Sequence, residues 1–136
     1  VRLKLNALRE AVQGKRVIMV DDSIVRGTTC ARLIKLVRDA GASEVHLRIS
    51  APPFRHPCFF GTDIPAQDLL LAHGRTVEEM REIIGADTLG FLSLEATRKI
   101  ARGCHLDFCD ACFTGEYPMD VPKQAQKNLF ESEIET

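Results

Sequence analysis

The chain has 136 residues, which is enough for one modest hydrophobic core but too few for two independent domains. Its 18 basic and 19 acidic residues give a formal net charge of −1, so it carries no basic field of the kind that holds nucleic acid. No apolar run is long enough to span a bilayer and no signal segment opens the chain, so we expect a cytoplasmic protein with neither membrane nor nucleic acid as partner.

The first residues have the pattern of a domain interior. Position 1 is Val rather than Met, and Val1, Leu3 and Leu5 alternate with polar residues. We therefore expect the chain to be a fragment of a longer protein.

The first half of the chain predicts a strand, a helix and a second strand. The apolar run at 17–20 ends abruptly at two acidic residues, as expected for a central strand that is buried on both faces of a parallel sheet. A helix capped by Thr28 or Thr29 should follow, with apolar residues at helical spacing and Gly41 at its end. The alternation at 45–49 predicts the second strand, so the whole segment forms a βαβ unit of the α/β class.

The second half of the chain is predicted to be mostly helical. The expected elements are a short helix at 66–72, a helix at 77–84 with a Thr76–Glu79 capping box and Gly85 at its end, a short strand at 89–92, and a helix at 94–101 between Ser93 and Gly103. Beyond it come a cysteine-rich stretch and a polar tail, the latter either a solvated helix or disordered.

The segment at 17–29, Val-Ile-Met-Val-Asp-Asp-Ser-Ile-Val-Arg-Gly-Thr-Thr, carries the strongest functional signal. Ligands bind at the carboxyl ends of strands in open α/β sheets, and a helix N-terminus offers N–H groups to an anion. Gly27 lets the backbone turn closely around a phosphate. Asp21 and Asp22 cannot serve a phosphate directly, because like charges repel, but they can accept hydrogen bonds from ribose hydroxyls or bind Mg²⁺. Further donors to the phosphate would come from Arg26, Thr28 and Thr29.

Each of these features also has an ordinary structural interpretation. Asp21, Asp22 and Ser23 fit a simple turn, Gly27 a loop residue and Thr28 a helix cap. The combination of strand, acid pair, glycine turn and hydroxyl residues in this order is more specific, and it favours a site for a ribose 5-phosphate.

The thirteen residues resemble the phosphoribosyl pyrophosphate motif of type I phosphoribosyltransferases. The form Asp-Asp-Ser-Ile-Val-Arg-Gly-Thr-Thr is similar to that of the amidophosphoribosyltransferase family in particular. The further segments that resemble this family are 41–46, 52–53, 56–58, 85–89 and 112–115. The resemblance implies a partial type I phosphoribosyltransferase fold followed by a mostly helical, cysteine-bearing C-terminal region. Its implied divisions are the C-terminal half of the phosphoribosyltransferase domain at 1–103, an iron–sulfur segment at 104–122 and a polar tail at 123–136.

The same resemblance implies an activity, ligands and partners. The family is a pentosyltransferase that makes 5-phosphoribosylamine from phosphoribosyl pyrophosphate and glutamine in the first step of de novo purine synthesis. The residues implied to bind phosphoribosyl pyrophosphate are Asp21, Asp22, Ser23, Val25, Arg26, Gly27, Thr28 and Thr29, with Mg²⁺ on Asp21 and Asp22. We expect purine nucleotides, a glutaminase domain of the same polypeptide and a homo-oligomer as partners. No catalytic residue is assigned in this fragment, which is expected to be inactive alone.

The five cysteines predict reduced thiols rather than disulfides, because their number is odd and no secretory signal is present. Cys109 and Cys112 form half of a metal or redox site, and Cys58 could supply a third ligand if the fold brings it near. A zinc half-site and free thiols remain alternatives, and Cys30 fits a core residue. In the iron–sulfur branch of the family, the matching cysteines hold a [4Fe–4S] cluster whose fourth ligand lies outside this chain, unless Cys104 substitutes for it.

Two other functional hypotheses remain. One is a non-catalytic regulator that senses nucleotides with a phosphoribosyltransferase fold, although the near-neutral charge and the cysteines speak against it. The other is a base-salvage phosphoribosyltransferase with a zinc-binding tail. We expect His56 to be a turn residue and Glu78, Glu79 and Glu82 to be a solvated helix face. No role is assigned to His46, His73 or His105.

Overall fold

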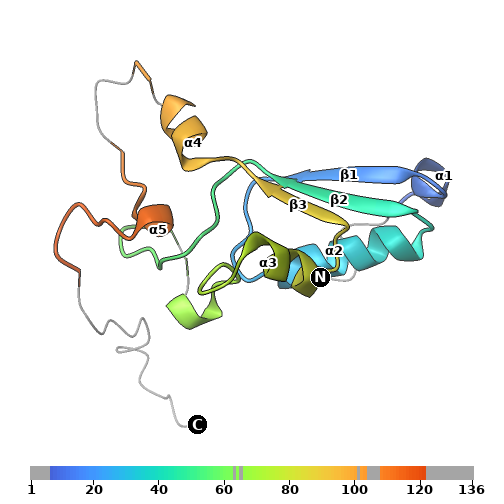
Figure 1. The fold of residues 1–136 in the computed structure, drawn as a ribbon, viewed down its shortest axis with the longest axis horizontal. Coiled ribbons are helices and arrows are strands. Elements are labelled where there is room, and N and C mark those ends of the chain that lie inside the picture. The colour runs from blue at the N-terminus through green and yellow to red at the C-terminus, as the bar shows by residue number, and fades with distance from the viewer. Residues whose placement is uncertain (1–6, 63, 65, 101, 104–107, 122–136) are drawn as a thin grey trace, which may run out of the picture.

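The computed structural model of the chain describes residues 7–62, 64, 66–100, 102–103 and 108–121. Within them, a parallel sheet has the strand order β1 (Arg16–Asp21), β2 (Glu44–Ile49) and β3 (Thr88–Phe91). The helices are α1 (Arg9–Val12), α2 (Thr28–Asp39), α3 (Val77–Ile84), α4 (Leu94–Ile100) and α5 (Ala111–Thr114), with a 3₁₀ turn η1 at Gln67–Leu69. Figure 1 shows α2 and α3 on one face of the sheet, and α4 and α5 beyond the carboxyl ends of its strands.

The core lies between the sheet and the two helices α2 and α3. Along β2 the side chains of Val45, Leu47 and Ile49 are buried, while the residues between them face the other side of the sheet. They pack with Ile34 of α2 and Met80 of α3 in one apolar cluster. The predicted βαβ unit is therefore confirmed, with α2 as its crossover.

The prediction that the first strand is central and buried on both faces is wrong for the described residues. There β1 pairs only with β2, and it forms one edge of the sheet. The side chains of Ile18 and Val20 are 68% and 75% exposed, because α2 and α3 cover only the opposite face. Within the part of the chain that the structure describes, the continuous apolar run of β1 therefore belongs to a strand that helices cover on one face only.

The predicted capping of the first long helix by a threonine is also wrong. Helix α2 begins at Thr28, and its N-cap is Gly27, which makes no side-chain hydrogen bond. Gly27 has φ of 79°, a left-handed conformation that places both threonines inside the first helical turn. The C-terminal end agrees with the prediction, since Gly41 follows the last turn with φ of 100°.

Helix α3 has the capping box that the sequence predicts. The Glu79 N–H donates to Thr76 Oγ1 at 3.2 Å, and the Thr76 N–H donates to Glu79 Oε2 at 2.7 Å. Gly85 ends the helix in a left-handed conformation, and Met80 and Ile84 are the residues of α3 that are buried.

The remaining elements agree with the sequence only in part. The short helix expected at 66–72 is limited to η1, because residues 70–72 form a buried turn instead. Strand β3 lies where it was expected, and α4 is capped by Ser93, whose Oγ accepts from the Ala96 N–H at 3.1 Å. The tail at 123–136 lies outside the described residues, and so do residues 104–107 at the expected start of the cysteine-rich division. The predicted divisions therefore remain predictions. No helix in the part of the chain that the structure describes is long and apolar enough to cross a membrane.

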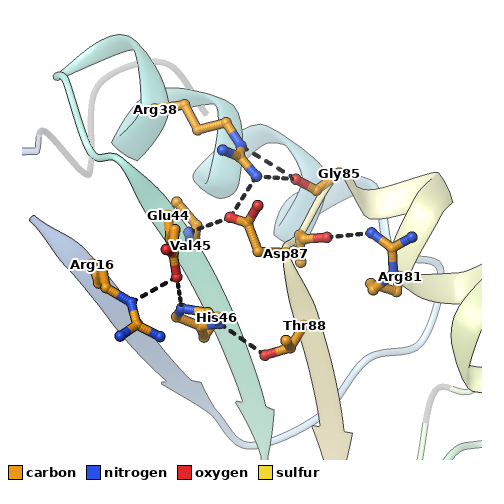
Figure 2. Close-up of polar contacts among 10 residues, drawn as sticks. Arg16, Arg38, Glu44, Val45, His46, Arg81, Gly85, Asp87 and Thr88 are labelled. Carbon is orange, nitrogen blue, oxygen red and sulfur yellow. Dashed lines mark hydrogen bonds and ion pairs between the residues drawn. The ribbon is translucent and has the colours of Figure 1, made fainter.

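One carboxylate ties both helices to the sheet (Figure 2). Asp87 Oδ2 accepts from the Val45 N–H at 2.6 Å and from Arg38 Nη2 at 2.8 Å. The same Arg38 nitrogen donates to the Gly85 carbonyl at 3.0 Å. The Val45 N–H, followed by the charge and hydrogen bond of Arg38, lowers the pKa of Asp87. The end of α2, the end of α3 and the start of β3 are thus joined to the amino end of β2.

A second polar group crosses the open face of the sheet near the amino ends of the strands. Glu44 Oε2 accepts from Arg16 Nε at 2.7 Å and lies 2.8 Å from His46 Nε2. The other ring nitrogen of His46 lies 2.9 Å from Thr88 Oγ1. His46, which had no role in the sequence analysis, therefore links β2 to β3, and its partner Glu44 links β2 to β1.

We expect Asp87→Asn to lower the free energy of unfolding at pH 7, because the amide cannot offer a charge to the Val45 N–H and Arg38. The folded-state pKa of Asp87 lies below its ordinary value of 3.8. Its stabilising effect is therefore complete above about pH 4 and is lost as the pH falls through the lower folded value. Urea unfolding of the wild type and the variant at pH 7 and pH 3 measures this difference.

Asp39→Asn is the matched control, because among the described residues Asp39 pairs only with Lys35, across an exposed helical turn. This control should change the free energy of unfolding little at either pH. An equal difference between the wild type and Asp87→Asn at both pH values would contradict the assigned role.

Candidate functional site

The two adjacent aspartates lie at the carboxyl end of β1 and differ in their surroundings. Asp21 Oδ1 accepts from the Asp22 N–H at 2.9 Å, and Asp21 Oδ2 lies 3.8 Å from the Cys30 sulfur. The Asp21 carbonyl accepts from the N–H of Ser50 at 3.0 Å. The Asp22 side chain is exposed, and no hydrogen bond from the described residues reaches its carboxylate. The chain therefore orients Asp21 and leaves Asp22 open to solvent.

Cys30 is the donor that faces Asp21 from the first turn of α2. Its side chain is only 5% exposed and belongs to the main apolar cluster. Burial, followed by the charge and hydrogen bond of Asp21, raises the pKa of Cys30 to about 11. The thiol is therefore protonated at neutral pH and can donate to the carboxylate. The expectation that Cys30 is a core residue is confirmed.

The loop at 22–27 connects the aspartates to α2, and two buried contacts anchor it. Ile24 is buried in the apolar cluster, and the Val25 carbonyl accepts from the Leu71 N–H at 2.8 Å. A Cβ at Gly27 would lie 2.8 Å from Leu71 Cδ2 and 3.4 Å from Ile84 Cγ2. A side chain is disfavoured there, because it would be strained by the positive φ and would have to displace the end of the Leu71 side chain.

The polar residues of this segment face solvent around the start of α2. Arg26, Thr28 and Thr29 are exposed, and Ser23 and Val25 are half-buried. Helix α2 has no acidic residue in its first turn and no side-chain cap at its N-terminus. The arrangement leaves main-chain N–H groups and the helix dipole available to an anion. The eight predicted binding residues thus lie at the end of β1, in the 22–27 loop and in the first turn of α2, and their binding of phosphoribosyl pyrophosphate remains a prediction.

The sequence analysis missed the residues behind this loop. Leu71 and Ile84 lie far from it along the chain, and nothing distinguishes them from other core residues. Ser50 follows β2 and holds the Asp21 carbonyl. The parallel pairing of β1 with β2 was the one available signal, because it sets the ends of these strands side by side.

The predicted cysteine ligands come together in part, where the segment after β2 passes α5 (Figure 1). The main-chain N–H groups of Arg55 and His56 donate to the Cys112 carbonyl at 2.9 and 3.0 Å. Cys58 and Cys112 are neighbours, and burial, followed by the electrostatic influence of Cys58, raises the pKa of Cys112 to about 11. Cys109 is exposed and acts on Cys112 electrostatically.

An aromatic group borders these cysteines. Tyr117 donates its hydroxyl to the Pro57 carbonyl at 2.8 Å, and its ring centroid lies 5.2 Å from that of Phe59 and 6.2 Å from that of Phe60. The described residues contain no group of three or more His, Cys, Asp or Glu side chains that could hold a metal ion. Cys104 lies outside these residues. The thiol pair is therefore observed, and the metal site remains a prediction.

The His56 ring packs against Gly115, where a Cβ would lie 2.9 Å from its Cε1 atom. Burial and the nearby positive groups of His73 and Arg55 lower the pKa of His56. This favours a neutral packing residue, in keeping with the expected turn position.

A mostly apolar pocket of about 460 Å³ lies beyond the carboxyl ends of β2 and β3. Its lining includes Pro52, Arg55, Phe91, Leu94 and Phe113. None of the eight predicted phosphoribosyl-binding residues lines it, so this pocket and the 22–27 loop are separate features of the same edge of the sheet.

Curated relatives of the chain carry one name, amidophosphoribosyltransferase. The protein of Bacillus subtilis is 54% identical over 125 residues, which are 89% of this chain and 26% of the relative. That of Archaeoglobus fulgidus is 50% identical over 90% of this chain and 27% of the relative. That of Synechococcus elongatus is 48% identical over 94% and 26%. The chain spans about a quarter of the length of these relatives, and no protein-family model matches it.

Solved structures agree with the relatives. A glutamine phosphoribosylpyrophosphate amidotransferase from B. subtilis, complexed with ADP and GMP, matches with a TM-score of 0.81 and 52% identity. The match covers 90% of this chain and 28% of that one. An allosteric regulatory enzyme of purine biosynthesis matches with a TM-score of 0.81 and 51% identity over 90% and 27%. These matches confirm the predicted α/β fold, and the names favour the main hypothesis over the regulator and the base-salvage enzyme.

We expect Gly27→Ala to lower the free energy of unfolding by about 3 kcal/mol, because it adds backbone strain and a clash with Leu71. Gly74→Ala is the control. Gly74 has φ of 64° but no atom within 4 Å of its Cβ position, so strain alone should cost about 1 kcal/mol. Urea unfolding compares the two variants, and equal losses would show that Leu71 does not restrict the loop.

Proposed function

Because this chain belongs to the amidophosphoribosyltransferase family, we propose that it supplies the ribose-5-phosphate-binding part of a complete amidophosphoribosyltransferase. That enzyme transfers glutamine-derived ammonia to carbon 1 of phosphoribosyl pyrophosphate, and the products are 5-phosphoribosylamine, pyrophosphate and glutamate. The observation that carries the proposal is the exposed helix N-terminus behind Gly27, next to a carboxylate that no described residue engages.

The chain's own contribution to this reaction is positioning. The main-chain N–H groups at the start of α2, with Arg26 and Thr28, bind the 5-phosphate as a fixed anchor. Asp22 accepts hydrogen bonds from the ribose hydroxyls. Asp21 fixes the backbone at this point, because its carboxylate accepts from the Asp22 N–H and from the Cys30 thiol. Fixing both ends of the sugar phosphate restricts its motion while carbon 1 reacts.

The acid pair also suits a divalent cation. The Asp22 carboxylate is exposed and has no described partner, and Mg²⁺ is usually held by one or two carboxylates together with substrate oxygens. Mg²⁺ held by these carboxylates would supply positive charge to offset the negative charge that develops on the departing pyrophosphate. The ammonia comes from a glutaminase domain elsewhere in the polypeptide, so this chain alone is inactive.

The cysteines form part of an iron–sulfur site in the same proposal. Cys58, Cys109 and Cys112 supply three of the four ligands of a [4Fe–4S] cluster, and the fourth comes from outside this chain. The contact between the thiols of Cys58 and Cys112 supports this assignment, since it joins segments far apart in the sequence. Thiolates are the usual ligands of such clusters, and a reducing cytoplasm keeps them available.

Purine nucleotides are the proposed regulatory ligands. The B. subtilis neighbour is described as a complex with ADP and GMP, which are purine nucleotides with a ribose 5-phosphate group. The same group would fit the anion site at the start of α2. The complete enzyme is proposed to be a homo-oligomer.

We expect Asp22→Asn in the complete enzyme to weaken Mg²⁺-dependent binding of phosphoribosyl pyrophosphate by about 10- to 100-fold, because a charge-assisted contact is lost. Titration calorimetry with and without Mg²⁺ measures the affinity. Asp68→Asn is the control, since Asp68 is exposed in η1 and should leave binding unchanged. Absence of Mg²⁺-dependent binding in the wild type would refute the proposed function.

Metal analysis of the complete enzyme tests the cysteine assignment. We expect iron with acid-labile sulfide, and loss of most of both in Cys58→Ser and Cys109→Ser. Cys30→Ser is the control, because Cys30 lies in the core beside Asp21 and should not alter the iron content. Zinc without sulfide would contradict the assignment and favour a zinc site.

A further inference from the structure

A turn at residues 70–72, well separated in the sequence, lies directly behind the 22–27 loop. Its three side chains, Leu70, Leu71 and Ala72, are buried. The Leu71 N–H donates to the Val25 carbonyl at 2.8 Å, which fixes the main chain of the loop two residues before Gly27. The 70–72 turn therefore contacts the loop through its backbone.

The second contact is steric. The two methyl carbons of Leu71 lie 2.8 and 3.4 Å from the position of a Cβ at Gly27, and Ile84 Cγ2 lies 3.4 Å from it. These side chains form an apolar wall against the Gly27 backbone. Because Gly27 is the N-cap of α2, the wall limits where the first N–H groups of the helix can point.

Two arginines hold the turn itself. Arg75 Nη1 donates to the carbonyls of Leu70 and Leu71 at 3.4 and 3.1 Å, and Arg55 Nη1 donates to the Ala72 carbonyl at 3.3 Å. Three consecutive carbonyls are thus satisfied by guanidinium groups from two separate segments. The turn follows η1 directly, where the sequence predicted that a helix would continue to residue 72.

We propose that Leu71, in the turn held by Arg55 and Arg75, is a positioning residue for the 22–27 loop. It sets the backbone conformation in which Gly27 and the start of α2 meet the 5-phosphate. The ligand part rests on the proposed function. A loop that is ordered before the ligand arrives binds more tightly, because less conformational entropy is lost on binding.

The test compares two buried leucines of the turn in the complete enzyme. Leu71→Ala removes the wall at Gly27. Leu70→Ala removes the same atoms from an equally buried position that lies outside the main apolar cluster and makes no close approach to Gly27. Both variants should lose stability, so the comparison separates loop positioning from a general cavity effect.

Two measurements apply to both variants. We expect amide hydrogen exchange in residues 24–29 to become about 10-fold faster in Leu71→Ala and to stay near wild type in Leu70→Ala. The KM for phosphoribosyl pyrophosphate should rise about 10-fold in Leu71→Ala, with kcat changed less than about 2-fold. Leu71→Met, which keeps most of the volume of the side chain, should restore both values.

Unchanged exchange in Leu71→Ala, or an equal increase in Leu70→Ala, would overturn the inference. Faster exchange with an unaltered KM would overturn the claim that Leu71 affects binding of the ligand. A wild type that does not bind phosphoribosyl pyrophosphate with Mg²⁺ would defeat the proposed function instead, and the exchange data would still decide whether the turn supports the loop.

Discussion

The left-handed turn at Gly27 is the constraint on which the candidate site depends. It ends the 22–27 loop, starts α2 without a side-chain cap and brings the chain against Leu71 and Ile84. A side chain at this position would meet both steric and backbone strain. The exposed N-terminus of α2 therefore follows from the way the loop packs on the core. Apolar contacts define the backbone there, and the surrounding polar side chains provide additional donors.

The two faces of the sheet show how far local patterns predict packing. One face is covered by α2 and α3, and the strict alternation of β2 follows from it. The other face carries Ile18 and Val20 in an exposed position, together with the polar group around Glu44 and His46. The apolar run of β1 has the composition of a strand that is buried on both faces of a sheet. Among the described residues, helices cover only one of these faces.

Much of the fold was predictable because its signals are local. The acid pair after an apolar run, the capping box at Thr76 and the glycines after α2 and α3 each act within a few residues, and all lie where the sequence places them. The errors came from non-local effects. Gly27 is the N-cap in place of a threonine and packs against Leu71, and the chain turns at 70–72 instead of continuing a helix, with Arg55 donating to the Ala72 carbonyl. No pattern in the sequence encodes those partners.

Arg55 contacts both the cysteine segment and the turn behind the candidate phosphate loop. Its main-chain N–H donates to the Cys112 carbonyl, and its guanidinium donates to the Ala72 carbonyl in the 70–72 turn. The main-chain contact holds α5 next to the segment that contains Cys58, the neighbour of Cys112. The guanidinium contact holds the turn that packs against Gly27. Because one residue makes both contacts, the packing of the cysteine segment and the seating of the 22–27 loop are not independent. The cysteine-bearing end of the chain is therefore connected through Arg55 to the residues that pack behind the candidate phosphate loop.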